Sequence, residues 1–288
     1  MKHPLTLSTF ILALAISCSI DTDKALQQDT QGAFDRLYAS IESSGSEDQT
    51  KVYLGEDVRL YWNVGDMISF FNKEMYNYQY EFKGNDGDRS GEFDKVSTIF
   101  HSKVPIDHVF AVYPYSSTTE IDDEEIICLY LPAVQTYSPG SFGRGANTMV
   151  SAGEDDNLFF KNTCGYLCFK FYAEGKSIKS VSLTGKGGEK IAGTATVTME
   201  PGGDPVLAMS GQSSGTVAIE CDEPVTLGSS AEEATQFWFV LPPVDFTDGL
   251  SVTLTDSEGN TFTKSTDKDF TIKRNSITRI AAFEVFCD

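Results

Sequence analysis

Short stretches in which every second position is hydrophobic run along the chain, and they predict β-strands. Leu37, Ala39 and Ile41 alternate with polar neighbours, so they share one face of a half-buried strand. Turn residues separate such stretches, and no helical period appears, which predicts an all-β fold of sandwiches or barrels. The expected strands are 37–41, 52–54, 58–62, 67–71, 76–82, 109–113, 126–131, 166–172, 178–183, 191–199, 217–220, 237–241, 250–255, 261–264 and 277–286.

The domain organisation follows from the length and from one loop-rich segment. A chain of 288 residues corresponds to about two domains at ~150 residues each. Residues 136–157 are rich in Gly, Ser and Asn, which favours a loop and a domain boundary there. We therefore expect one β-sandwich over residues 33–157 and a second over residues 158–288.

The N-terminus has the pattern of a secretory signal. Lys2 and His3 precede a mostly apolar stretch at 5–16, which is too short for a membrane span and suits a signal peptide. The next residues, Ala-Ile-Ser-Cys, resemble a bacterial lipobox, which implies cleavage before Cys18 and a lipid on its thiol. The alternative is ordinary cleavage after Ala15, which leaves a soluble secreted protein.

With lipidation, residues 1–17 are the signal peptide and residues 18–32 are a polar tether that carries the lipid. The acidic residues behind Cys18 resemble the signal that sends lipoproteins of Bacteroidota-type bacteria to the outer surface. We therefore expect a location at the outer membrane and the cell surface, with the membrane contacted through the lipid on Cys18.

The charge of the chain excludes two classes of partner. Lys and Arg number 22 and Asp and Glu number 42, so the net charge is −20. A nucleic-acid binder needs a basic footprint, and so does a protein held to anionic lipid by its own side chains. Hydrophobic residues at 40% exclude a disordered chain.

None of the catalytic or metal motifs is convincing. Residues 211–215 spell G-x-S-x-G, but no helix is expected after them, and a serine hydrolase needs a nearby His. Residues 86–97 begin like a calcium loop and end in Ser97 instead of a bidentate acid. The acidic run at 120–125 suits a solvated loop better than a cation site. We expect no enzyme activity, no metal and no cofactor.

The cysteines are expected to be small buried hydrophobes. Without Cys18 the chain has five, an odd number that leaves a free thiol. Cys164 and Cys168 lie four residues apart on an expected strand, about 13 Å, which is too far for a disulfide. A shared zinc ion would require a turn at Gly165.

A series of short segments occurs in a fixed order along the chain. The segments are 37–42, 50–54, 58–62, 64–70, 110–115, 131–137, 160–167, 178–185, 192–193 and 239–243. Their order resembles the fimbrillin family, the subunits of type V pili, over residues 33–285.

The resemblance implies two transthyretin-like β-sandwiches in series and assembly by strand exchange. In such pilins a surface protease removes the first strand, and a strand of a neighbouring subunit fills the groove. Here Leu37, Ala39 and Ile41 would fill the groove, and cleavage would fall between Lys51 and Val52. The family usually has Arg at the cleavage position, so Lys51 implies a protease of other specificity or no cleavage.

The C-terminal strand, with Ile277, Ile280, Phe283 and Val285, either completes its own domain or serves as the donor. Its shortness favours an accessory, tip or anchor-like subunit over a stalk pilin. The expected partners are other pilus subunits and an adhesion ligand on a host or bacterial surface.

The alternative function is a non-polymerising surface lipoprotein that binds glycans or host ligands. The alternating tyrosines at 76, 78 and 80 suggest a sugar-stacking platform for this alternative, although core packing explains them equally well.

Overall fold

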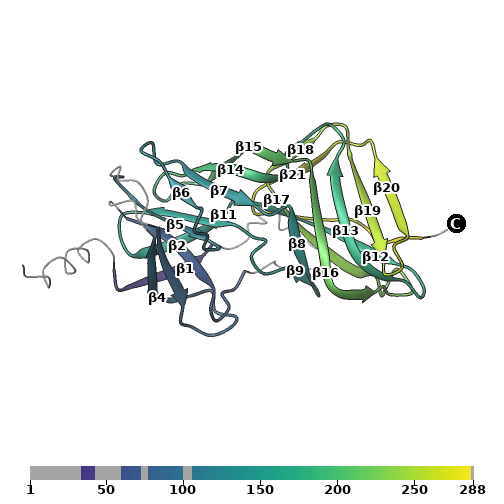
Figure 1. The fold of residues 1–288 in the computed structure, drawn as a ribbon, viewed down its shortest axis with the longest axis horizontal. Coiled ribbons are helices and arrows are strands. Elements are labelled where there is room, and N and C mark those ends of the chain that lie inside the picture. Colours follow the sequence, from purple (N-terminus) through teal and green to yellow (C-terminus); the bar gives the residue numbers. More distant parts are fainter. Residues whose placement is uncertain (1–33, 43–59, 73–76, 100–105, 287–288) are drawn as a thin grey trace, which may run out of the picture. The chain divides into compact units, whose positions relative to one another are not determined.

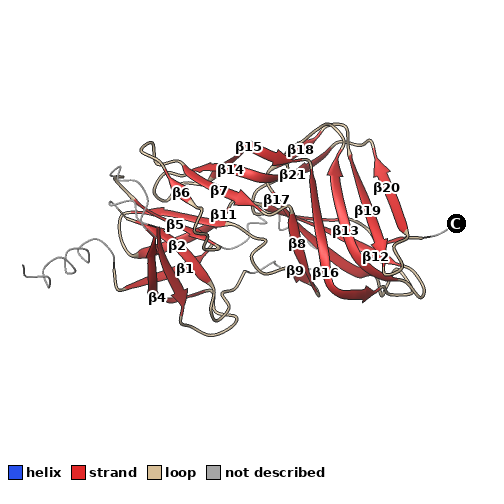
Figure 2. Cartoon of the chain, viewed as in Figure 1, coloured by secondary structure: helices blue, strands red, loops and turns tan. Residues whose placement is uncertain are grey.

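The computed structural model describes residues 34–42, 60–72, 77–99 and 106–286, and all of its regular structure is β-strand (Figures 1 and 2). The expected all-β class is confirmed. In the described part of the chain, no helix is long and apolar enough to cross a membrane. The signal peptide, the tether, Cys18, Lys51, Val52 and Tyr76 lie outside the described residues.

Seven strands from the first part of the chain form a closed barrel (Figure 1). The barrel closes because β1 bonds to a strand on either side, β11 in parallel and β4 in antiparallel. Around the barrel the order is β1 (Arg36–Ile41), β11 (Asn157–Asn162), β10 (Met149–Gly153), β5 (Val109–Tyr113), β2 (Met67–Phe71), β3 (Asn77–Phe82) and β4 (Ser90–Ile99).

The remaining strands form smaller sheets. One contains β17 (Thr235–Leu241), β12 (Gly165–Tyr172), β22 (Ile277–Arg279) and β23 (Phe283–Glu284). A second contains β20 (Thr261–Thr266), β19 (Leu250–Asp256), β13 (Ser177–Gly185), β16 (Thr216–Thr226), β8 (Val134–Ser138) and β9 (Ser141–Phe142). The others are β15 (Val206–Ser214), β14 (Ala192–Thr198), β7 (Ile127–Leu131) and β6 (Glu120–Ile121), and the pair β18 (Val244–Phe246) and β21 (Phe270–Ile272).

Three apolar clusters fill the spaces between these sheets. The barrel encloses an aromatic core centred on Trp62, whose ring lies 5.1–6.0 Å from four other aromatic rings. β5 is apolar at every position because its two faces contribute to different clusters, with Ala111 inside the barrel and Phe110 outside. β12 is likewise buried on both faces. Continuous apolar runs therefore mark the strands that lie between two cores.

Most predicted strands that alternate clearly agree with the structure, and three segments of weak pattern were wrongly interpreted. The strand expected over 58–62 is also wrong in its described part, because residues 60–62 make one isolated bridge, from Trp62 to Asp88. Residues 136–157, expected to be a loop, contain β9 and β10 and parts of β8 and β11. Here Gly140 makes the turn of a short hairpin at φ +71°, so the turn residues mark a hairpin and not a long loop. Residues 90–99 form β4, which was missed because its sequence is mostly polar.

Residues 211–214 of the G-x-S-x-G segment lie in β15, where no strand was expected. Its Gly211 has φ +51° and sits where the register with β14 shifts. A bulged strand on a sheet is unlike the strand–turn–helix of a nucleophile elbow.

Strands pair across the expected boundary at residue 157. β7 pairs with β14, β8 pairs with β16, and residue 157 itself begins β11 of the barrel. One apolar cluster draws residues from both sides of that boundary, among them Phe110 and Trp238. The division into two domains stays a prediction.

Candidate functional site

The first strand, β1, lies between two other strands of the barrel and has a backbone hydrogen-bond ladder on both of its edges. On one side Leu37 stands opposite Phe93 of β4, and on the other Ala39 stands opposite Leu158 of β11. The Tyr38 amide donates to the Asp156 carbonyl at 3.0 Å. If β1 were absent, β4 and β11 would both become open edges with unpaired N–H and C=O groups.

The three side chains predicted to fill a groove do lie in the barrel core. Leu37, Ala39 and Ile41 are at most 5% exposed and belong to the cluster around Trp62, whereas Tyr38 between them is exposed. Burying a Leu or Ile side chain contributes about 1.5–3 kcal/mol each. Loss of β1 would therefore leave an apolar groove flanked by two ladders.

Phe34, which precedes β1, also contacts the barrel. The Phe34 ring contacts the Phe70 ring edge-on, at 6.2 Å between centroids. The Tyr80 hydroxyl donates a hydrogen bond to the Phe34 carbonyl, and burial raises the pKa of Tyr80. Tyr80 and Tyr78 are buried, so they are core residues, and the sugar platform suggested for them is wrong.

Glu42, the residue that follows β1, contacts a residue near the C-terminal end of the chain. Glu42 is 9% exposed, and its Oε1 accepts a hydrogen bond of 2.6 Å from Arg274 Nη1. The same oxygen accepts the backbone N–H of Asn162, at the end of β11. Pattern reasoning missed this carboxylate, because nothing distinguishes one acid among 42 from the others, and its partner is 232 residues away.

A polar network continues inward from this carboxylate. Asn162 Nδ2 donates to Asn275 Oδ1 at 2.7 Å, and Asn162 Oδ1 accepts from Asn147 and from the Tyr166 hydroxyl. Burial raises the pKa of Tyr166, so its hydroxyl stays a donor. The end of β1 is thus joined to β11, β12 and the segment before β22.

The C-terminal strand completes its own sheet. Ile277 stands opposite Tyr166 in the parallel ladder between β22 and β12, and Ile280 packs against the second-half core. The Phe283 ring contacts the Phe171 ring at 5.1 Å, and Val285 is buried. The single strand expected over 277–286 is two short strands with a break between them.

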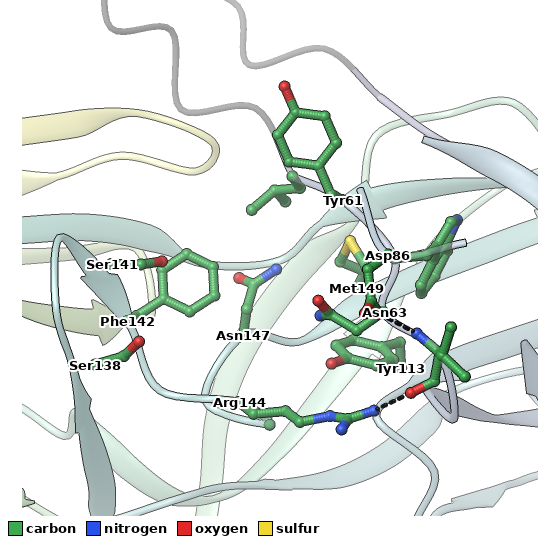
Figure 3. A pocket seen from close by; sticks show the side chains of 14 residues that line it. Tyr61, Asn63, Asp86, Tyr113, Ser138, Ser141, Phe142, Arg144, Asn147 and Met149 are labelled. Atoms are coloured by element: carbon green, nitrogen blue, oxygen red, sulfur yellow. Dashed lines mark hydrogen bonds between the residues drawn. The ribbon is translucent and has the colours of Figure 1, made fainter. Parts of the chain in front are cut away.

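A pocket of about 570 Å³ opens beside the barrel (Figure 3). Its rim carries the exposed ring of Tyr61, the half-buried ring of Phe142 and the side chains of Arg144 and Asn63. Arg144 Nη2 contacts the buried carboxylate of Asp66 at 2.8 Å, and this hydrogen bond raises the pKa of Arg144.

Other sequence candidates have structural roles. The described cysteines are all free thiols, and burial raises the pKa of Cys164 to about 12 and that of Cys168 to about 11. In the acidic run, Asp122 Oδ1 accepts two backbone N–H groups of its own turn. Glu125 Oε2 lies 2.7 Å from His108 Nδ1.

No protein-family model matches the chain, and no curated protein matches its sequence. Similar solved structures include a candidate cell adhesion protein from Bacteroides ovatus, 14% identical with a TM-score of 0.48, over 86% of this chain and 91% of that one. A second candidate cell adhesion protein, from Bacteroides uniformis, is 16% identical with a TM-score of 0.45, over 86% and 93%.

The tip fimbrial protein Mfa3 from Porphyromonas gingivalis, with a C-terminal truncation, is 10% identical with a TM-score of 0.36, over 85% of this chain and 94% of that one. These structural neighbours are cell adhesion and fimbrial proteins of Bacteroidales. Their names agree with the family that the sequence segments resemble.

Proposed function

We propose that this protein is a structural or adhesive subunit of a type V pilus, and that it assembles by strand exchange at the position of β1. One observation carries the proposal: β1, the first described strand, lies between β11 and β4 in the closed barrel, with a ladder on each edge and three apolar side chains in the core. A strand from another subunit that supplied the same ladder and the same apolar positions would restore the fold.

The place of β1 in the chain suits its removal. It is the first described strand, and the candidate cleavage site between Lys51 and Val52 follows it. A cut there severs β1 from the rest of the barrel without breaking another strand of the described chain. The groove then exposes apolar surface and two open edges, which favours capture of a donor strand.

Two subunit roles fit this geometry. A cut subunit that has lost β1 accepts a donor and stands within the polymer. A subunit that keeps β1 and the lipid on Cys18 ends the polymer at the outer membrane, as an accessory or anchor-like subunit. In the uncut chain the Glu42–Arg274 contact holds β1 in place. This contact favours the second role, in which β1 is kept.

The pocket favours a second candidate function, a surface lipoprotein that binds a glycan or host ligand without polymerising. Tyr61 is 46% exposed at its rim, and an exposed aromatic ring beside amide and guanidinium donors suits a sugar. In this case β1 would be a permanent part of the barrel. The proposed function is not enzymatic in either case.

The test uses protein recovered from the bacterial surface. We expect it in polymers or attached to other subunits, and the intact mass and N-terminal sequence identify its role. An N-terminus at Val52 without lipid marks a subunit whose first strand was replaced, whereas diacylated Cys18 with β1 retained marks an end subunit. Lys51→Gln should abolish the first form, and Lys83→Gln should not.

Protein found solely as a monomer, with lipid and β1 in place and no other subunit attached, would contradict the pilus role. That outcome would favour the second candidate.

A further inference from the structure

Glu42 makes polar contacts at the end of the proposed strand-exchange groove. The apolar side chains of β1 do not supply such contacts. Its carboxylate is buried at the exit of the groove, where it pairs with Arg274 and accepts the Asn162 N–H. Arg274 also donates to the Asn162 carbonyl at 3.0 Å. The carboxylate, the guanidinium and the end of β11 therefore form one closed set of hydrogen bonds.

Removal of β1 removes Glu42 with it and leaves these partners behind. The Asn162 N–H, on a residue 1% exposed, loses its acceptor, and a buried N–H without an acceptor is unfavourable. Arg274 loses its buried carboxylate and keeps the Asn162 carbonyl and a contact of 3.3 Å with Asp204, a side chain that is 67% exposed and also binds Lys161. The emptied groove thus ends in a positive charge whose remaining ion pair is with an exposed carboxylate, and in a buried N–H without its acceptor.

The apolar positions alone do not define how a donor strand sits in the groove. Because side chains alternate in a strand, a slip of two residues keeps the same face inward. Such a slip moves every side chain along the groove by about 7 Å. The slip would carry a carboxylate out of reach of Arg274. The positive charge of Arg274 therefore distinguishes between registers that the apolar alternation alone would allow equally.

We propose that the groove selects a donor strand with apolar side chains at three alternate positions followed immediately by a carboxylate, and that Arg274 reads this carboxylate and sets the register. The inference rests on the proposed function and names the chemistry of its partner strand. The occupant is an extended peptide segment of another subunit in which an Asp or Glu takes the place of Glu42.

The test measures peptide binding to the groove of the full chain. A sequence-specific protease site replaces residues 43–50, the protein is cut, and fluorescent peptides with the sequence of residues 34–42 compete with the resident strand. We expect the Glu42→Gln peptide to bind about 10- to 100-fold more weakly than the parent. A peptide with two residues inserted before Glu42 should be weakened to the same extent.

Two controls separate charge recognition from general effects. Arg36 forms ion pairs with Glu92 and Asp94 at the exposed start of β1, so the Arg36→Gln peptide should stay within about threefold of the parent. Arg274→Gln in the protein should abolish the preference for Glu42 over Gln. If that variant does not fold, the peptide series on the unmodified protein still tests whether the groove recognises the carboxylate.

The outcomes also separate this inference from the function on which it rests. Equal binding of the parent and Glu42→Gln peptides would overturn the role of Arg274 and leave strand exchange standing. Failure of every peptide to enter the groove of the folded protein would overturn strand exchange, and this inference with it.

Discussion

At the scale of single residues, neighbours in the sequence have opposite roles in this barrel. Trp62 is fully buried and contacts four aromatic rings, whereas Tyr61 beside it is exposed at the pocket. The alternation of an expected strand at 58–62 predicts such a contrast between adjacent positions. It does not show which of the two aromatics is inside, because both residue types occur in cores and at surfaces.

Replacing Trp62 should therefore test the barrel core. We expect Trp62→Ala to lower the free energy of unfolding by about 3–5 kcal/mol, because a large cavity replaces a side chain in contact with four rings. Tyr61→Ala is the matched control and should change it by less than about 0.5 kcal/mol. Urea unfolding followed by far-ultraviolet circular dichroism measures both, and equal effects would contradict the assigned core.

At the scale of elements, alternation was a good guide and polar strands were not. β1, β2 and β5 were predicted almost to the residue, since each has a clear apolar pattern. β4 and β15 were missed because they expose many polar side chains and draw their stability from the ladders on their edges. β15 pairs with its neighbour β14, and β4 pairs with its neighbour β3 and with the distant β1, so neither strand needs an apolar pattern of its own that a local reading could detect.

The turn between β19 and β20 offers a test by pH. Asp256 Oδ1 accepts the N–H groups of Glu258 and Asn260, and Oδ2 contacts Lys176 at 3.1 Å. The hydrogen bonds from Asn260 and then from Lys176 lower the pKa of Asp256 to about 2. Because an unfolded Asp has a pKa of about 3.9, this carboxylate stabilises the fold above that value.

We expect the stability from Asp256 to be lost as the pH falls from about 4 towards 2. Asp256→Asn should flatten this part of the dependence, measured by urea unfolding across the range. Asp269→Asn, at an exposed position between β20 and β21, should leave this pH dependence of stability unchanged. Identical profiles for the unmodified protein and Asp256→Asn would show that the turn does not hold the charged form.

At the scale of the whole molecule, several contacts around the barrel join distant parts of the chain. β7 and β8 pair with strands of the second half, and Glu42 pairs with Arg274. The spacing of Leu37, Ala39 and Ile41 predicted the face that they share in the core, but it did not predict the Glu42–Arg274 pair that follows them. A sequence pattern shows which face of a strand is apolar, whereas partners 232 residues apart become visible only in the fold.

The central claim is that β1 can be replaced while the rest of the barrel stays folded. Native mass spectrometry tests it on the chain cut within residues 43–50 and incubated with an isotope-labelled peptide of residues 34–42. We predict that the labelled strand replaces the resident one, and that a labelled Leu37→Asp peptide does not. A resident strand that never exchanges, or equal uptake of both peptides, would contradict a groove built for strand exchange.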